Sequence, residues 1–104
     1  MNLSPVEAIN RINESVTVEM LIQKTKRCSG SRKVFLDSEA SHHDPKNLGV
    51  VVAENVWAQF SEAGIEASTA HFHGKTIRVR GVVIHKENRP YIEVNDLSQI
   101  ELVM

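Results

Sequence analysis

Apolar and polar residues alternate with a period of two along most of this chain. Five segments show the pattern strongly enough to predict strands: residues 16–23, 34–36, 48–52, 76–84 and 90–94. Successive side chains of a strand point to opposite faces, so one apolar set from each segment can share a core. We expect that core to contain Val16, Val18, Met20, Val34, Leu36, Val50, Val52, Ile77, Val79, Val83, Ile92 and Val94. Residues 100–103 extend or close the last strand.

Two short segments have helix signals instead. The Ser-Pro-Val-Glu run near the start has the spacing of a capping box, which predicts a short helix over residues 4–12. A second helix is expected over residues 56–63, with Asn55 as its cap and Gly64 as its stop.

The order of elements is therefore three strands, one helix and two strands. This order fits an all-β, five-stranded antiparallel meander closed into an OB-type barrel, with the helix between the third and fourth strands. It fits alternating βα folds poorly, because those need a helix after nearly every strand. A length of 104 residues suits one domain, so we expect residues 1–104 to be a single OB-fold domain with its barrel at 16–103. Gly81 interrupts the fourth strand, as expected where a barrel bends.

Two segments in the second half of the chain are distinctive. Residues 74–83 read GKTIRVRGVV and residues 89–100 read RPYIEVNDLSQI. The first resembles the fourth-strand signature of bacterial OB-fold domains, and the second resembles their closing segment, with Leu97 where many relatives have proline. The resemblance implies the barrel but not its ligand, because OB barrels bind single strands, sugars and proteins. Staphylococcal-type nucleases share the barrel, but their calcium carboxylates and catalytic arginines cannot be placed in this sequence.

Basic residues gather in the loop between the first and second strands. Five of the chain's 12 lie within ten positions without an acid among them: Lys24, Lys26, Arg27, Arg32 and Lys33. Turn-forming residues at 29–31 predict that residues 24–33 form a hairpin. The loop at 85–90 adds Lys86 and Arg89. In OB barrels these two loops flank the binding groove, so together they could follow a phosphate backbone. A solvated hairpin kept soluble by its charge is an equal alternative.

Aromatic residues are few, at 5% of the chain. Trp57 and Phe60 fall on the predicted helix and are expected in the core. Phe35 and Tyr91 are out of phase with their aliphatic neighbours, so their rings should point outward, where rings can stack on bases. The net charge is −1, whereas dedicated nucleic-acid binders are usually basic, so any such site must be a local patch.

Two arginines of the fourth strand, Arg78 and Arg80, also point away from the core. They could touch phosphate, but outward arginines on strands more often pair with acids on neighbouring strands. Glu19 and Glu93 are available on the first and fifth strands, and we favour this pairing.

Histidine and cysteine do not indicate a metal or a catalytic site. His71 and His73 project to one side of an extended chain, but zinc needs at least a third protein ligand. That ligand would come from His42, His43, His85 or Cys28, in spacings that match known zinc patterns only loosely. Cys28 has basic neighbours but no recognisable base or oxyanion site. We expect no metal, no cofactor and no enzymatic activity.

Two functions stay open. The first is a non-catalytic module that binds single-stranded DNA or RNA through Lys24, Lys26, Arg27, Arg32, Lys33, Phe35, Lys86, Arg89 and Tyr91. The alternative is a protein-interaction or accessory barrel within a larger protein or complex. The single cysteine, the lack of a signal peptide and the lack of an 18-residue apolar stretch favour a soluble, cytoplasmic protein that does not enter membranes.

Overall fold

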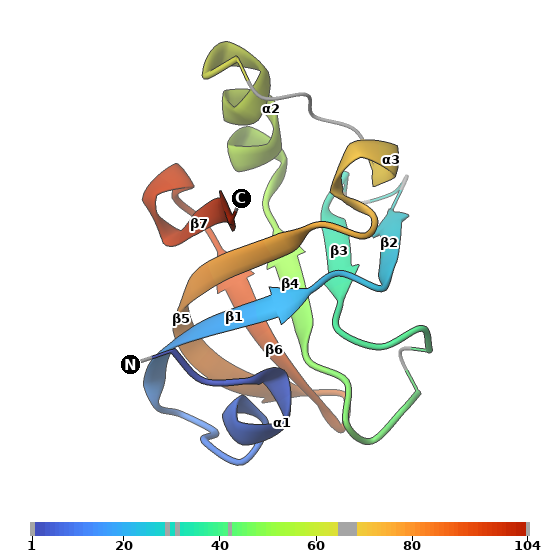
Figure 1. Ribbon diagram of the computed structural model, residues 1–104, viewed down its shortest axis with the longest axis vertical. Coiled ribbons are helices and arrows are strands. Elements are labelled where there is room, and N and C mark those ends of the chain that lie inside the picture. The colour runs from blue at the N-terminus through green and yellow to red at the C-terminus, as the bar shows by residue number, and fades with distance from the viewer. Residues whose placement is uncertain (1, 29, 31, 42, 65–68, 104) are drawn as a thin grey trace.

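The computed structural model describes residues 2–28, 30, 32–41, 43–64 and 69–103, and Figure 1 shows their arrangement. The described chain is mostly sheet with a few short helices. Its strands are β1 (Ser15–Leu21), β2 (Lys24–Arg27), β3 (Val34–Asp37), β4 (Gly49–Val52), β5 (Thr76–Lys86), β6 (Arg89–Val94) and β7 (Ile100–Val103). Its helices are α1 (Pro5–Ala8), α2 (Glu54–Glu62), α3 (Thr69–Phe72) and the 3-10 turn η1 (Leu97–Gln99). Among these residues, no helix has the length and apolar character needed to span a membrane.

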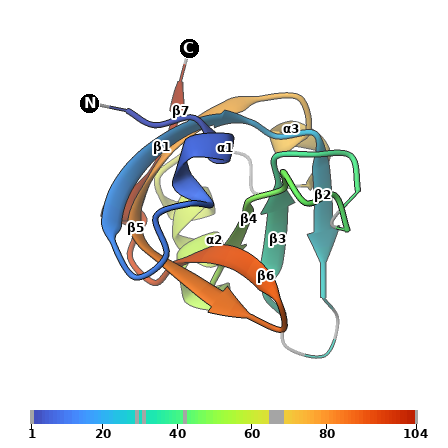
Figure 2. The same cartoon turned by 90° about the horizontal axis from the view of Figure 1, so that it is seen from below.

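Within the described residues, seven strands form one sheet. Its order is β1-β5-β6-β4-β3-β2, with β7 also paired to β5. The two ends of this order, β1 and β2, are consecutive in the chain and separated only by Ile22 and Gln23. The sheet therefore curves around an interior, as the view in Figure 2 shows. The first half of the predicted basic loop is strand β2, which pairs with β3 from Lys24–Asp37 to Arg27–Val34.

One pairing differs from the predicted antiparallel meander. Strands β4 and β6 run parallel, from Gly49 beside Tyr91 to Val52 beside Val94. Parallel neighbours need a crossover of a dozen or more residues, and the stretch containing α2, α3 and β5 supplies it. The prediction that all strands are antiparallel is therefore wrong at this pair.

The predicted core is largely confirmed. Eleven of its twelve residues are buried, and Val16 is half-buried and packs against the others. Helix α2 adds Trp57 and Phe60, as expected from their positions. Helix α3, which the sequence pattern did not predict, adds Phe72, whose ring centroid lies 5.1 Å from those of both Trp57 and Phe60. The aromatic residues of α2 and α3 thus form one cluster.

The capping box of α1 is present as predicted. The Glu7 backbone N–H donates to Ser4 Oγ over 3.2 Å, and the Ser4 backbone N–H donates to Glu7 Oε1 over 2.9 Å. Hydrogen bonds to the Glu7 carboxyl from the backbone N–H of Ser4, and secondly from its side chain, hold the pKa of that carboxyl below its usual value. The helix ends after Ala8 and is shorter than the predicted range of 4–12.

The start of α2 was predicted incorrectly. Its N-cap is Ala53, and Asn55 lies inside the first turn. The backbone of Ala53 is extended, and its carbonyl accepts hydrogen bonds from the N–H groups of Val56 and Trp57. The helix therefore begins directly after β4, although alanine offers no side-chain cap. Gly64, the predicted stop, has the left-handed φ of +80° typical of the residue after a helix.

The closing segment is held in place by the side chain of Gln99. Its Oε1 accepts from the backbone N–H groups of Asn95 (2.8 Å) and Asp96 (3.0 Å). Its Nε2 donates to the carbonyl groups of Arg80 (2.9 Å) and Glu93 (3.1 Å). One amide therefore links β5, the end of β6 and η1.

Gly81 lies beneath this amide, where β5 changes partners. Strand β5 pairs with β7 from Thr76 to Val79 and with β1 as far as Val82, and from Val83 onward it pairs with β6. A Cβ at position 81 would lie 2.8 Å from Ile92 Cγ2 and 3.2 Å from Gln99 Nε2. The glycine thus provides the space for Gln99 to cross the sheet. Strand β7 pairs with β5 and is not an extension of β6.

Candidate nucleic-acid interface

The outer face of β2, β3, β4 and β6, which we call the ring face, contains both rings predicted to point outward. Phe35 on β3 and Tyr91 on β6 are half-buried, whereas Leu36 and Ile92 beside them are fully buried. The two rings meet edge to face, with their centroids 6.5 Å apart. The outward orientation predicted for Phe35 and Tyr91 is thereby confirmed.

Gly49 makes room for this contact. It lies on β4, between the strands that bear the two rings, and it is the register partner of Tyr91. A Cβ at position 49 would lie 2.5 Å from Tyr91 Cδ1 and 2.6 Å from Cε1. The Tyr91 ring therefore lies over the backbone of β4 and reaches Phe35 across it. Sequence reasoning missed Gly49, although a glycine at the start of a valine strand is a signal for close approach.

Two hollows open on either side of the rings. The first has a volume of about 240 Å³ and is lined by Lys24, Lys26, Cys28, Phe35, Asp37, Arg89 and Tyr91. The second has a volume of about 210 Å³ and is lined by Lys33, Phe35, Val51, Ile84, Lys86, Glu87, Tyr91 and Glu93. The rings line both hollows. Seven of the nine predicted site residues are thus brought together on one face.

The other two predicted residues lie elsewhere. Arg27 follows Lys26 on β2, and its side chain points to the opposite side of the strand. Arg32 has a positive φ of 58° at the end of the hairpin. Its guanidinium pairs with Glu54 at the start of α2, with Nη1 and Oε1 3.2 Å apart. The five clustered basic residues of the sequence therefore do not share one surface.

The ring face has a local excess of positive charge. Five cationic side chains line the two hollows, against the three acids Asp37, Glu87 and Glu93. Asp37 is 5% exposed and accepts a hydrogen bond from Asn47 Nδ2 over 3.1 Å. The patch is therefore cationic in a chain whose net charge is −1.

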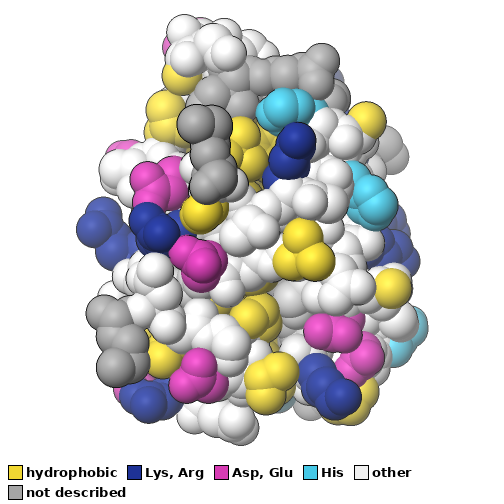
Figure 3. Space-filling model, in the orientation of Figure 1, with side chains coloured by type: hydrophobic (Ala, Val, Ile, Leu, Met, Phe, Trp, Pro, Cys, Tyr) yellow, Lys and Arg dark blue, Asp and Glu magenta, His cyan; other side chains and the backbone are white. Residues whose placement is uncertain are grey.

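On the outer face of β1, β5 and β7, which we call the paired face, Arg78 forms ion pairs with two acids. Arg78 Nη2 lies 2.9 Å from Glu19 Oε1, and Arg78 Nη1 lies 2.8 Å from Glu101 Oε1. These two hydrogen bonds raise the pKa of Arg78 above its usual value. The predicted pairing with Glu19 is confirmed. The second acid is Glu101 on β7, and Glu93 lines the second hollow instead. Figure 3, viewed from the β1 side, shows basic and acidic side chains next to one another.

His71 and His73, the two histidines considered first as metal ligands, make separate contacts. His71 packs edge-on against Phe72, and His73 Nε2 lies 3.1 Å from the carbonyl oxygen of Gln23. Among the described residues, no group of three or more His, Cys, Asp or Glu side chains could hold a metal ion. His42, one of the ligands considered above, lies outside the described residues.

Comparison with known proteins extends the description of the fold. No protein-family model matches this sequence, and no curated protein matches it. Among solved structures, asparaginyl-tRNA synthetase from Pyrococcus horikoshii aligns with a TM-score of 0.62 and 17% identity, over 98% of this chain and 23% of that one. A chain of the S. pombe Stn1–Ten1 complex aligns with a TM-score of 0.57 and 16% identity, over 86% and 57%. A chain of a replication protein A heterotrimer bound to single-stranded DNA gives 0.52 and 15%, over 86% and 57%.

These structures have OB-type folds, and the likeness shows that this chain has such a fold. Identities of 15–17% show the fold alone and do not place the chain in a bacterial family. The chain spans between 23% and 57% of the length of these three neighbours.

Proposed function

We propose that this chain is a non-catalytic module that binds single-stranded nucleic acid across its ring face. The observation that supports this most strongly is that predicted site residues from distant parts of the sequence lie together on one face. Residues predicted from two separate segments, 24–35 and 86–91, line two adjoining hollows that share the Phe35 and Tyr91 rings. The neighbour bound to single-stranded DNA supports the same class of ligand.

We further propose that residues 1–104 act as one five-stranded OB barrel, in which β1 and β2 count as a single bent strand. Backbone hydrogen bonds at the bend support this count. Ile22 donates to Lys75 and accepts from Gly74, while Gln23 donates to Asp37, so one residue pairs toward β5 and the next toward β3. In this arrangement α2 and α3 lie between the third and fourth strands of the barrel.

Stacking and charge would act together on this face. A base that stacks on an aromatic side chain contributes roughly 1–3 kcal/mol, and it does so with little dependence on sequence. The cations around the rings are placed to meet the phosphates on either side: Lys24, Lys26, Lys33, Lys86 and Arg89. If four of them each neutralise one phosphate, the log–log salt slope for a single strand is about −3.

A matched pair of variants tests the proposal, because Lys26 and Arg27 are consecutive but point to opposite sides of β2. We expect Lys26→Glu to weaken binding of a labelled oligothymidylate by about tenfold or more and to flatten the salt slope. Arg27→Glu changes the net charge equally and should have a much smaller effect. Fluorescence anisotropy between about 50 and about 200 mM salt measures both, and melting temperatures confirm that both variants fold.

Equal losses in the two variants would show that net charge, not the ring face, controls binding. If the unaltered chain bound neither single- nor double-stranded oligonucleotides at low salt, the proposal would be overturned. The leading alternative would then be a protein-interaction barrel, a possibility that the Stn1–Ten1 complex among the neighbours also suggests.

A further inference from the structure

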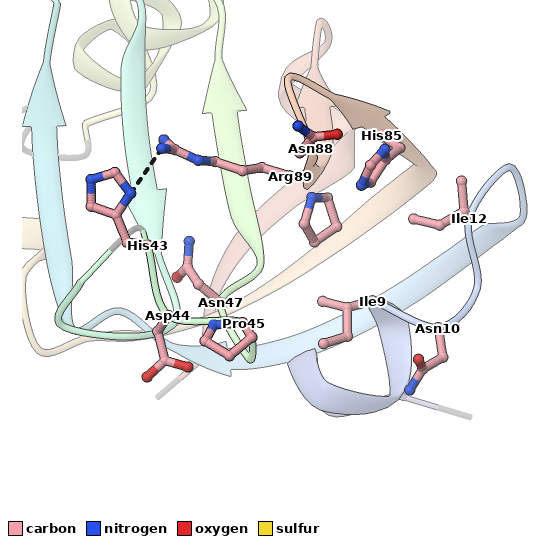
Figure 4. Close-up of a pocket in the computed structure, with 11 residues that line it drawn as sticks. Ile9, Asn10, Ile12, His43, Asp44, Pro45, Asn47, His85, Asn88 and Arg89 are labelled. Atoms are coloured by element: carbon pink, nitrogen blue, oxygen red, sulfur yellow. Dashed lines mark hydrogen bonds between the residues drawn. The ribbon is translucent and has the colours of Figure 1, made fainter.

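A third hollow, larger than the two on the ring face, opens beside α1. Its volume is about 430 Å³, and it lies between α1, the loop that precedes β4 and the turn that joins β5 to β6 (Figure 4). Its walls are partly apolar, with Ile9, Ile12, Pro45 and Pro90 among the residues that line it. None of the ring-face residues except Arg89 contributes to it.

Arg89 connects this third hollow to the first one, because its side chain lines both. Its guanidinium Nη2 lies 3.0 Å from Nδ1 of His43 across the opening (Figure 4). Arginine can only donate, so His43 Nδ1 must accept, and the proton of a neutral ring is then on Nε2. The side chain of Arg89 thus forms a shared wall between the first and the third hollow.

The remaining polar groups suit a ligand with both a flat apolar part and hydrogen-bonding groups. His85 and Asn88 add ring nitrogens and an amide at the β5–β6 end of the hollow. The one acid, Asp44, accepts a hydrogen bond from the Lys46 backbone N–H over 2.9 Å. In Figure 4 its carboxylate points away from Arg89 and His43, so it does not face the positive end of the hollow.

We propose that the third hollow is a subsite for a further nucleotide of the strand that the ring face binds. This inference rests on the proposed function and extends it. The volume falls in the range of about 300–1,000 Å³ typical of small-ligand pockets. Base and sugar would lie against Ile9, Ile12 and Pro90, and the phosphate that links the two sites would lie at Arg89. The strand would then run from the rings over Arg89 toward α1.

A length series with matched variants tests this subsite. His85 and Lys86 are consecutive on β5, but His85 lines the third hollow and Lys86 lines the second. Affinities for oligothymidylates of about 4 to about 12 nucleotides, a range that OB folds commonly cover, should rise with length in the unaltered chain. We expect His85→Glu to lower affinity for the longer oligonucleotides about fivefold or more and to leave the shortest unaffected. Lys86→Glu should weaken all lengths by a similar factor.

The outcomes separate this inference from the function on which it rests. If His85→Glu keeps the full gain with length, or if it weakens every length equally, the third hollow is not a subsite even though the ring face binds. If the unaltered chain binds no length at low salt, both proposals fail. Both substitutions replace exposed side chains, and unchanged melting temperatures would verify that the comparison is between folded proteins.

Discussion

The ring face and the paired face belong to the same sheet and use similar residues in opposite ways. On the paired face, Arg78 bridges Glu19 and Glu101 from the two strands that flank β5. On the ring face, lysines surround two rings, and more cations than acids line the hollows. Arg78 lies between the buried Ile77 and Val79, and on the ring face Phe35 lies in the same way between the buried Val34 and Leu36. The difference comes from the neighbouring strands: β1 and β7 each bring an acid to Arg78, whereas β3 and β6 each bring a ring to the ring face.

Removing one group from each face should show the largest contrast in binding. Tyr91→Ala removes a ring and should cost roughly 1–3 kcal/mol per stacked base, or about fivefold to 150-fold in affinity. The salt slope should change little, because stacking releases no counterions. Arg78→Met removes a cation that is already paired and should leave affinity nearly unchanged. Anisotropy titrations of both variants measure the contrast, and a larger loss from Arg78→Met would reverse our assignment of the two faces.

The next effect concerns stability and should leave binding intact. Gln99→Ala removes four hydrogen bonds that link β5, β6 and η1, and leaves their backbone partners without this amide. We expect the free energy of unfolding to fall by about 1–3 kcal/mol in urea denaturation. Gln99→Glu serves as a second variant: it keeps the acceptor oxygen but turns a carboxylate oxygen toward the carbonyl oxygens of Arg80 and Glu93, so at neutral pH it should lose at least as much stability. A stability unchanged in Gln99→Ala would mean that these bonds are readily replaced by water.

The smallest expected effect is on the stability of the fold at acid pH. Hydrogen bonds from Ser98 hold the pKa of the Asp96 carboxyl below its usual value of 3.8. The charged carboxylate therefore stabilises the folded state above this value, and that contribution is lost as the pH falls through the lower folded pKa. Asp96→Asn can still accept at the cap but has no charge to lose. The gap between the melting temperatures of the two proteins should shrink between about pH 5 and about pH 2.5. A constant gap would contradict the assigned shift.

Alternation along the chain was sufficient to predict which residues lie inside and which lie outside. It placed Val18, Val79 and Ile92 in the core and directed Phe35 and Tyr91 outward, because side-chain direction depends only on the local backbone. The capping box of α1 could also be predicted, because Ser4 and Glu7 are only three positions apart. The closing segment resembled known OB domains, and the hydrogen bonds of Gln99 now give a physical reason for its sequence.

What alternation could not predict depends on partners distant in sequence. The parallel register of β4 and β6 decides that Tyr91 lies beside Gly49, and nothing near either residue indicates it. The ion pair of Arg32 with Glu54 depends on where α2 begins, and the sequence placed that start at the wrong residue. The third hollow is likewise assembled from three separated segments.

The pairing of β1 with β5 also has a consequence for how the chain reaches its native state. Its closest partners, Leu21 and Thr76, are 55 positions apart, and its most distant, Ser15 and Val82, are 67 apart. Contacts this distant lose much chain entropy before they contribute, so proteins rich in them fold slowly. The β2–β3 and β5–β6 hairpins close short loops, whereas the β1–β5 ladder must close a loop of at least 55 positions. During synthesis, β1 therefore has no partner along this edge until β5 has left the ribosome.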